Sequence, residues 1–257
     1  NCSATAELTR DVSARLTEKA DVRPERCAVV ATHTHSAPLL PTFAQWHYTK
    51  EMPPEHLANM KRYRRELTDR LEKVALDALA SRKPGRLAWS QGVVTFGSNR
   101  RRLENGKWVG FVRGNETDSP GPVDHGLPVL RVTDLTGKLL GVVANYACHC
   151  TTTSGSYNSI HGDWAGYAQT AIQAEHPGTV AMITIGCGGD ANPEPRGDMD
   201  AAHQNGLAVA DEVVRLIQEP REPLTGQLTA RMQQIKLPFG QLPTREQLEQ
   251  RAKKQGR

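Results

Sequence analysis

The chain has 257 residues, of which 38% are hydrophobic, 5% aromatic and 23% charged, with a formal net charge of +4. This length suffices for one large α/β domain or two small ones with a substantial buried core. The basic residues are spread out and no apolar run approaches the length of a membrane span, so neither nucleic-acid binding nor an integral membrane segment is expected. The five cysteines include no CxxC pair, which argues against a zinc ribbon or a disulfide framework.

The N-terminal part of the sequence predicts a helix followed by a strand that ends on two histidines. Apolar residues at helical spacing extend to about Ala20, and a buried strand is expected from Cys27 to Thr32. His33 and His35 follow, and Pro38 breaks the run. Residues i and i+2 of an extended segment lie on one face, so both imidazoles could bind one metal ion, or one could bind metal and the other substrate. The alternative is a pair of polar residues at a strand end.

Long loops separate the next predicted elements, a helix and a strand. In chain order these are an irregular loop (Leu39 to Pro54), a helix (His56 to Ser81), a strand (Arg86 to Phe96) and a glycine-rich excursion or flap (Gly97 to Pro122). The first loop holds Trp46, His47 and Tyr48, and a loop with aromatic side chains often covers a site. Asn99 and Arg100 stand at the head of the excursion.

Strands alternate with helices in the second half of the chain. In chain order the predicted elements are a hairpin (Pro128 to Val132 and Leu139 to Ala147), a helix (Trp164 to Glu175), a strand (Thr179 to Ile185), a helix (Met199 to Ile217), a late strand (Leu224 to Leu237) and a charged, helix-prone tail (Thr244 to Arg257). Asp163 suits the N-cap of its helix. The predicted fold is α/β, a mixed sheet flanked by helices, in a single large domain over residues 1–257 that we expect to be cut at both ends.

Three strand-like runs end on ligand-type residues, which could converge in space. His33, His149 and an acidic or phenolic group could then hold Zn²⁺ with one position open for water. Such an ion lowers the pKa of its water to about 7 and polarises a carbonyl, as amide or ester hydrolysis requires. Arg100 would bind an anionic or oxyanionic group. Taken singly, His149 also fits a core histidine, and Asp190 and Asn192 fit plain turn chemistry.

A thiol nucleophile is the alternative chemistry. Cys148 and Cys150 flank His149, but adjacent residues of a strand point to opposite faces. Cys187 is therefore the candidate nucleophile for a thiol hydrolase that works with His149. The sequence contains no GxSxG, HExxH or GxxxxGK[ST] motif, so it supports neither a serine elbow, a zincin helix nor a phosphate loop.

Five short blocks of the sequence occur in a recognisable order. They are Thr32 to Pro38, Asn99-Arg100, the strand ending at His149, Gly162-Asp163 with Gly166-Tyr167-Ala168, and Gly186 to Pro193. Together they resemble the catalytic domain of the neutral/alkaline (non-lysosomal) ceramidase family, from the first helix to Asp198, and the chain looks like a divergent member. The resemblance implies a zinc-dependent amidase that cleaves an N-acyl bond, and it favours a secreted or periplasmic location.

The resemblance also implies roles for individual residues. It makes His33 and His149 zinc ligands and places His35 and Arg100 beside the substrate. The complete expectation is catalysis by His35, Asp190 and Asn192, and substrate binding by Arg100, Asn99 and Asp163. The family's other two zinc ligands, a glutamate and a tyrosine, have no assigned counterpart in this sequence.

One position departs from the family pattern. The family's Gly-Asp-x-Ser-Pro block reads Gly189 to Pro193 here, and Asn192 stands at the serine position. An amide donates and accepts hydrogen bonds but cannot be deprotonated as a nucleophile. If metal-activated water is the attacking group, hydrolysis survives and Asn192 orients the substrate or an oxyanion.

The predicted function is therefore zinc-dependent hydrolysis of an N-acyl amide or an ester, with a small-molecule or lipid-like substrate. Two alternatives stay open. One is a catalytically silent ceramidase-like module that binds a sugar or lipid, and the other is the thiol hydrolase that uses Cys187.

Overall fold

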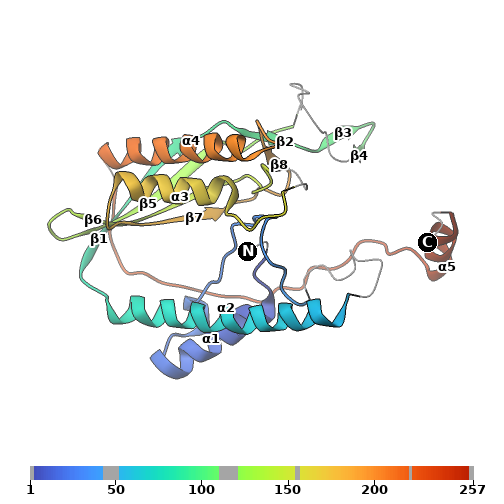
Figure 1. Cartoon of the computed structure of the whole chain (residues 1–257), viewed down its shortest axis with the longest axis horizontal. Coiled ribbons are helices and arrows are strands. Elements are labelled where there is room, and N and C mark those ends of the chain that lie inside the picture. The colour runs from blue at the N-terminus through green and yellow to red at the C-terminus, as the bar shows by residue number, and fades with distance from the viewer. Residues whose placement is uncertain (1–2, 43–51, 110–120, 154–156, 220–221, 255–257) are drawn as a thin grey trace.

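The computed structural model describes residues 3–42, 52–109, 121–153, 157–219 and 222–254. The helices are α1 (Ala6–Ala20), α2 (Pro54–Ala80), α3 (Asp163–Glu175), α4 (Met199–Gln218) and α5 (Arg245–Lys254). The strands are β1 (Gly85–Val93), β2 (Gly97–Asn99), β3 (Arg102–Glu104), β4 (Lys107–Val109), β5 (Gly126–Asp134), β6 (Leu139–Tyr146), β7 (Val180–Ile185), β8 (Ala191–Pro193) and β9 (Glu222–Leu224). Figure 1 shows their arrangement.

The largest sheet has five strands in the order β7-β6-β5-β1-β9. β5 and β6 form an antiparallel hairpin, and β6 pairs in parallel with β7 after a crossover through α3. Asp134 fixes the hairpin turn because its Oδ1 accepts from the amides of Thr136 and Lys138 at 2.8 and 2.9 Å. Gly137 takes the positive φ of 95° at this turn. The predictions of a hairpin here and of a mixed α/β sheet are confirmed.

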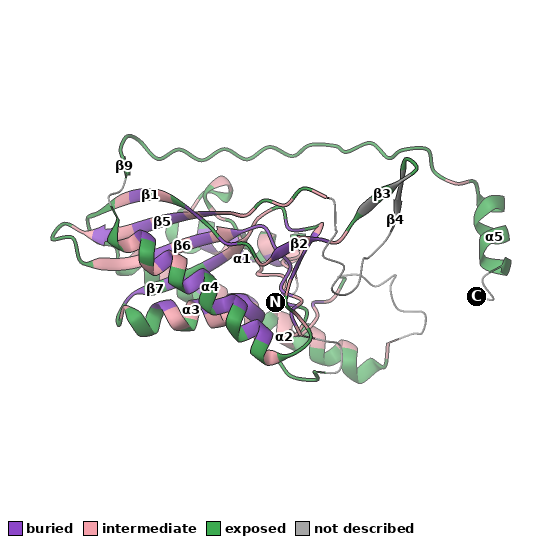
Figure 2. Ribbon diagram, turned by 90° about the horizontal axis from the view of Figure 1, so that it is seen from above, coloured by how far each residue is buried: buried purple, intermediate pink, exposed green. Residues whose placement is uncertain are grey.

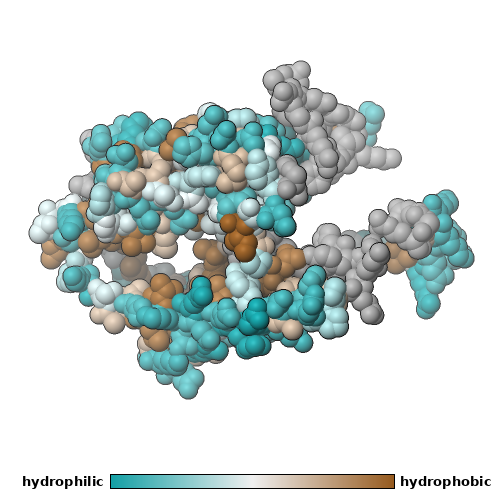
Figure 3. All heavy atoms as spheres, in the orientation of Figure 1, coloured by the Kyte–Doolittle hydropathy of each residue, from teal (hydrophilic) through white to brown (hydrophobic). Residues whose placement is uncertain are grey.

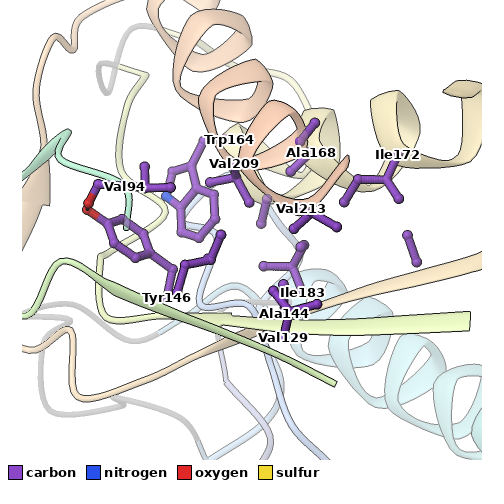
Figure 4. Packing of buried hydrophobic residues seen from close by; sticks show 14 of the residues in the cluster. Val94, Val129, Ala144, Tyr146, Trp164, Ala168, Ile172, Ile183, Val209 and Val213 are labelled. Atoms are coloured by element: carbon purple, nitrogen blue, oxygen red, sulfur yellow. The ribbon is translucent and has the colours of Figure 1, made fainter. Parts of the chain in front are cut away.

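The main core lies between this sheet and the helices α3 and α4. Burial alternates along β5, where Leu127 and Val129 are buried, because successive side chains of a strand face opposite sides of the sheet. Trp164 of α3 is fully buried and meets the ring of Tyr146 edge to face, with centroids 5.8 Å apart. Figure 4 shows this packing, and Figure 2 shows the buried residues on the sheet and on the helix faces toward it.

α1 and α2 form a helical pair with a second, smaller core. Glu72 of α2 accepts from Arg15 of α1 at 3.0 Å and also from Lys19. The buried apolar residues of this core are Leu8, Val12, Leu16 and Leu40. Figure 1 places the pair on the side of the sheet away from α3 and α4, and Figure 3 shows a hollow between the two parts with hydrophobic residues along its walls.

The strand predicted from Cys27 to Thr32 is wrong. The segment pairs with no strand among the residues that the structure describes, and Val30 is 66% exposed. Cys27 and Val29 pack instead against the core of α1 and α2. The run is apolar, as the sequence shows, but its side chains contact two helices and take no place in a sheet.

The late strand predicted from Leu224 to Leu237 is also wrong in most of its length. β9 ends at Leu224, and the residues that follow are exposed and belong to no described strand, as the green trace in Figure 2 shows. β1 ends at Val93, three residues before the predicted Phe96. Beyond β1 the backbone bonds change partner, since the amide of Val94 donates to the carbonyl of His125 and the carbonyl of Phe96 accepts from the amide of Glu194.

The remaining elements agree with the sequence more closely. α1, α2, α3, α4 and β7 lie where apolar periodicity predicts them, and the charged tail contains α5. The glycine-rich excursion carries β2, which pairs with β8, and the small hairpin of β3 and β4. The predicted covering loop with Trp46, His47 and Tyr48 lies outside the described residues. None of the helices in the described ranges has the length and apolar character needed to cross a bilayer.

Candidate metal centre

Three histidines from two separate segments meet at one point. The ring centroids of His33 and His149 are 4.8 Å apart, those of His33 and His35 4.9 Å, and those of His35 and His149 5.9 Å. One ring nitrogen of each lies within 4.8 Å of the others, and the Nε2 atoms of His33 and His35 are 3.3 Å apart. We call these three residues the histidine cluster. Three imidazole nitrogens at such separations suit Zn²⁺, with a fourth position left for water or substrate.

The backbone of His33 turns sharply to bring its ring to this point. Its φ of 57° lies in the left-handed region, which a non-glycine residue adopts at a cost. His35 is exposed, and its amide donates to the carbonyl of Cys150 at 3.2 Å. The rings of His33 and His35 thus converge through a backbone turn that is hydrogen-bonded to Cys150, and not because they lie on one face of a strand.

His149 is held more tightly than the other two histidines. It follows β6 by three residues and is only 7% exposed. Its amide donates to the carbonyl of Ala191 at 3.0 Å, and its carbonyl accepts from Nε1 of Trp164 at 2.9 Å. Its ring Nδ1 lies against the carbonyl oxygen of Gly188, which leaves Nε2 for the cluster.

The surroundings of His149 and His35 favour the neutral form of these two rings. Burial lowers the pKa of His149 to about 4, and the positive charge of Arg100 adds to the effect. The pKa of His35 is lowered as well, first by partial desolvation and then by the charges of His33 and Arg100. Neutral imidazoles are the form that binds a metal ion.

Arg100 lies beside the cluster and is fixed by the turn after β7. Its amide donates to the carbonyl of Asp190 at 2.7 Å, and its Nε and Nη2 donate to the carbonyl of Gly189 at 3.1 and 2.8 Å. Its Nη1 lies 3.3 Å from Oδ1 of Asn192. Pairing of β2 with β8 sets this arrangement, because it places Asn99 opposite Ala191. A guanidinium held in this way can bind a carbonyl oxygen or an oxyanion.

The two asparagines of these short strands are buried. Asn192 is 3% exposed, and its Oδ1 accepts from Arg100 and lies 3.5 Å from the hydroxyl of Thr151. Asn99 is 6% exposed, its Nδ2 donates to the carbonyl of Pro122 at 2.8 Å, and its Oδ1 accepts from the amide of Arg101 at 2.7 Å. Both amides therefore fix the backbone and the arginine around the site.

The predicted N-cap role of Asp163 is wrong, since Gly162 is the N-cap of α3. Asp163 occupies the first helical position with a φ of 54° and is 1% exposed. Its carboxylate accepts from the amide and hydroxyl of Thr152, at 2.9 and 2.6 Å, and from the amide of Trp164 at 2.8 Å. Through these contacts the carboxylate fixes the loop behind the cluster. Its negative charge also acts on His35, where it opposes the lowering of the pKa.

Three cysteines lie close to members of the cluster in the chain or through the backbone, but none belongs to the cluster. Cys148 and Cys150 are buried, and burial raises the pKa of both thiols well above the ordinary range, which makes them poor nucleophiles. Cys187 is exposed. Among the described residues no cysteine, aspartate or glutamate joins the three histidines in a group that could hold a metal ion.

The sequence allows His161-Gly162-Asp163 to supply ligands, but the structure places His161 and Asp163 outside the histidine cluster, where they hold the surrounding loops. Sequence reasoning gave no role to Gly188 or Thr153, whose partners include His149 and Ser36. No local pattern marks Thr153 or the carbonyl of Gly188.

Comparisons with known proteins agree with the motifs. No family model matches the chain. An alignment of 83 residues is 34% identical to neutral ceramidase B of Dictyostelium discoideum, covering 29% of this chain and 12% of that protein. A neutral ceramidase structure from Pseudomonas aeruginosa has a TM-score of 0.64 at 20% identity, over 86% of this chain and 36% of that one. A ceramidase complexed with C2 has a TM-score of 0.67 at 22% identity, over 86% and 35%.

These matches confirm the resemblance to the neutral ceramidases in sequence and fold. The chain is similar in sequence to a neutral ceramidase over 83 residues and has the fold of part of the two solved ceramidases. It spans about a third of the length of the two solved ceramidases and 12% of the curated relative.

Proposed function

We propose that this ceramidase-like domain, residues 1–257, is the catalytic part of a zinc-dependent hydrolase that cleaves an N-acyl amide or an ester bond. The observation that carries the proposal is the histidine cluster, three imidazoles whose nitrogens lie within 4.8 Å of one another. When bound, the ion would polarise a carbonyl and lower the pKa of water to about 7. The names of the similar proteins favour an amide substrate over an ester.

We assign His33 and His149 as the metal ligands. His149 is buried with its free nitrogen oriented by Gly188, and the ring of His33 lies nearest to it, at 4.8 Å. His35 is exposed at the open side of the cluster, so we assign it to the substrate. Its lowered pKa makes it a neutral base near pH 7 that can accept a proton and pass it to the leaving amine.

Arg100 and its neighbours form the wall that faces the substrate carbonyl. The Arg100 guanidinium would donate to the oxyanion that develops during hydrolysis. Asn192 accepts from Arg100 and so positions it, which gives the residue at the family's serine position a role that needs no nucleophile. Asp190 anchors Arg100 through its carbonyl, and Asn99 and Asp163 hold the two loops behind.

A binding module without hydrolytic activity is the second candidate, and the asparagine at position 192 favours it. Such a module would bind metal and a sugar or lipid but would hydrolyse no acyl amide or ester. A thiol hydrolase would instead be inactivated by alkylation of Cys187 and would tolerate chelators.

The test is the metal content and activity of the purified chain. We expect bound zinc, hydrolysis of a short-chain N-acyl amide, loss of activity with a chelator and recovery with Zn²⁺. His33→Ala and His149→Ala should each lose the metal, whereas His56→Ala, at an exposed histidine of α2, should keep it. Unchanged zinc content in both site variants would rule out the metal assignment, and metal without hydrolysis would favour the binding module.

A further inference from the structure

His161 lies between the segment that carries His35 and the start of α3. Its backbone amide donates to the carbonyl of Ser36 at 3.0 Å, and its carbonyl accepts from Oγ1 of Thr34 at 3.0 Å. Both neighbours of His35 in the chain are therefore bonded to this one residue, although 127 positions separate Thr34 from His161.

The ring of His161 extends the same connection to a second loop. Its Nδ1 accepts from the amide of Asp163 at 3.1 Å, which places the proton of the neutral ring on Nε2. Nε2 lies 3.2 Å from Oγ1 of Thr153 and can donate to it. Oγ1 of Thr153 in turn lies 3.4 Å from Oγ of Ser36. These contacts thus connect His161 through Thr153 to Ser36.

The second loop, Cys150 to Thr153, is the one on which His35 rests. The amide of His35 donates to the carbonyl of Cys150, and the carboxylate of Asp163 accepts from the amides of Thr152 and Thr153 at 2.9 and 3.4 Å. His33 has a left-handed backbone that must be held by its surroundings. The His161 ring contacts Thr153 and Asp163, which belong to the loops beside this backbone turn.

We propose that His161 is a positioning residue, whose ring fixes the His33–Ser36 segment against the Cys150–Thr153 loop so that His33 and His35 meet His149. The proposal rests on the proposed function, because it gives a metal centre its geometry. The His161 ring contacts Thr153 and Asp163, and Thr153 in turn contacts Ser36, the residue after His35. Partners of this kind typically change metal affinity about 10- to 100-fold when removed.

The first measurement is amide hydrogen exchange of the full chain, which needs no metal. His161→Ala should speed exchange in the peptide that covers His33 to Ser36 by about tenfold, because the ring's hydrogen bonds are lost. Peptides of β5 and β6 should be unchanged. Thr153→Val keeps the side-chain volume and removes the hydroxyl, and it should give the same local effect even if His161→Ala proves unstable.

Conservative variants separate positioning from packing. His161→Asn keeps an acceptor near the Nδ1 position, and His161→Gln keeps a donor near Nε2, so each should restore part of the protection and part of the Co²⁺ affinity measured by absorption. His56→Ala is the control and should match the wild type. Unchanged exchange over His33 to Ser36 in both His161→Ala and Thr153→Val would overturn the proposal.

The two proposals fail in different ways. If the wild-type chain bound no Co²⁺, the proposed function would fall, while the exchange data would still decide the role of His161. If Co²⁺ bound with equal affinity to the wild type and to folded His161→Ala, the positioning role would fall and the metal centre would stand.

Discussion

The ring Nδ1 of His149 lies at hydrogen-bond distance from the carbonyl oxygen of Gly188. A carbonyl can only accept, so the neutral ring carries its proton on Nδ1 and has a lone pair on Nε2. His149 is also buried, and its pKa is lowered to about 4. The pair therefore gives the site one imidazole with a fixed orientation and a fixed charge, as a metal ligand requires.

Substitution of Gly188 should weaken metal binding without touching a ligand. A Cβ there would lie 2.8 Å from the backbone nitrogen of Cys148, so Gly188→Ala must move the carbonyl that orients His149. We expect a loss of metal affinity of about 10- to 100-fold, measured by titration against a chelator. Gly189→Ala is the matched control, since nothing lies within 4 Å of its Cβ position. Equal affinities in the two variants would contradict the role of this carbonyl.

His35→Ala should separate substrate chemistry from metal binding. The assignment of His35 as the proton-transfer residue predicts a fall in kcat of about 10²- to 10⁴-fold with zinc content unchanged. His33→Ala should lose both zinc and activity. Elemental analysis beside steady-state kinetics checks the pair. Loss of zinc from His35→Ala would show instead that His35 is a third ligand.

Arg100→Gln should lower kcat/KM and leave the metal in place. Removal of a charged donor aimed at a developing oxyanion typically costs about 10²- to 10³-fold in rate. Arg101→Gln changes the next residue, which is exposed, and should behave as the wild type. Kinetics on a short-chain N-acyl amide checks the comparison. A similar loss in both variants would point to general charge attraction and not to a positioned contact.

Asn192→Leu should destabilise the fold, because the new side chain offers no acceptor to Arg100 or Thr151. Each of these partly buried hydrogen bonds contributes about 1 kcal/mol, and denaturant unfolding can measure the loss. Asn192→Asp keeps the acceptor and adds attraction to the guanidinium, so it should retain most of the stability. If leucine and aspartate were equally well tolerated, the proposed positioning of Arg100 would be wrong.

Acid should loosen the contact between α1 and α2 through Glu72. Hydrogen bonds from Lys19 and Arg15 lower the pKa of this carboxyl in the folded chain. The stability that it contributes is therefore present above its ordinary pKa of about 4.3 and is lost as pH falls through the lowered folded value. Thermal unfolding as a function of pH should show this loss in the wild type and not in Glu72→Gln. Glu66→Gln, at an exposed glutamate of the same helix, should keep the acid dependence.

Local sequence patterns predicted the helices well. The periodicity of apolar residues places α1, α2, α3 and α4 within a few residues of their observed bounds, because a helix satisfies its backbone hydrogen bonds within itself. The same reasoning failed for Cys27 to Thr32 and for the late strand after Leu224. An apolar run indicates which side chains are buried, but a strand also needs a neighbouring strand, which the run itself does not specify.

For the site, the sequence by itself determined which side chains could take part. These are the imidazoles of His33, His35 and His149, with Arg100 and Asn192 as their neighbours. Only the tertiary structure decided that they meet. The turn at His33 depends on a left-handed backbone angle. The contact of His149 with the Gly188 carbonyl and the bonds of His161 to Thr34 and Ser36 join residues that are distant in the chain. Residue periodicity reports local hydrogen bonding and burial, whereas a metal centre depends on distances that only the packed loops can fix.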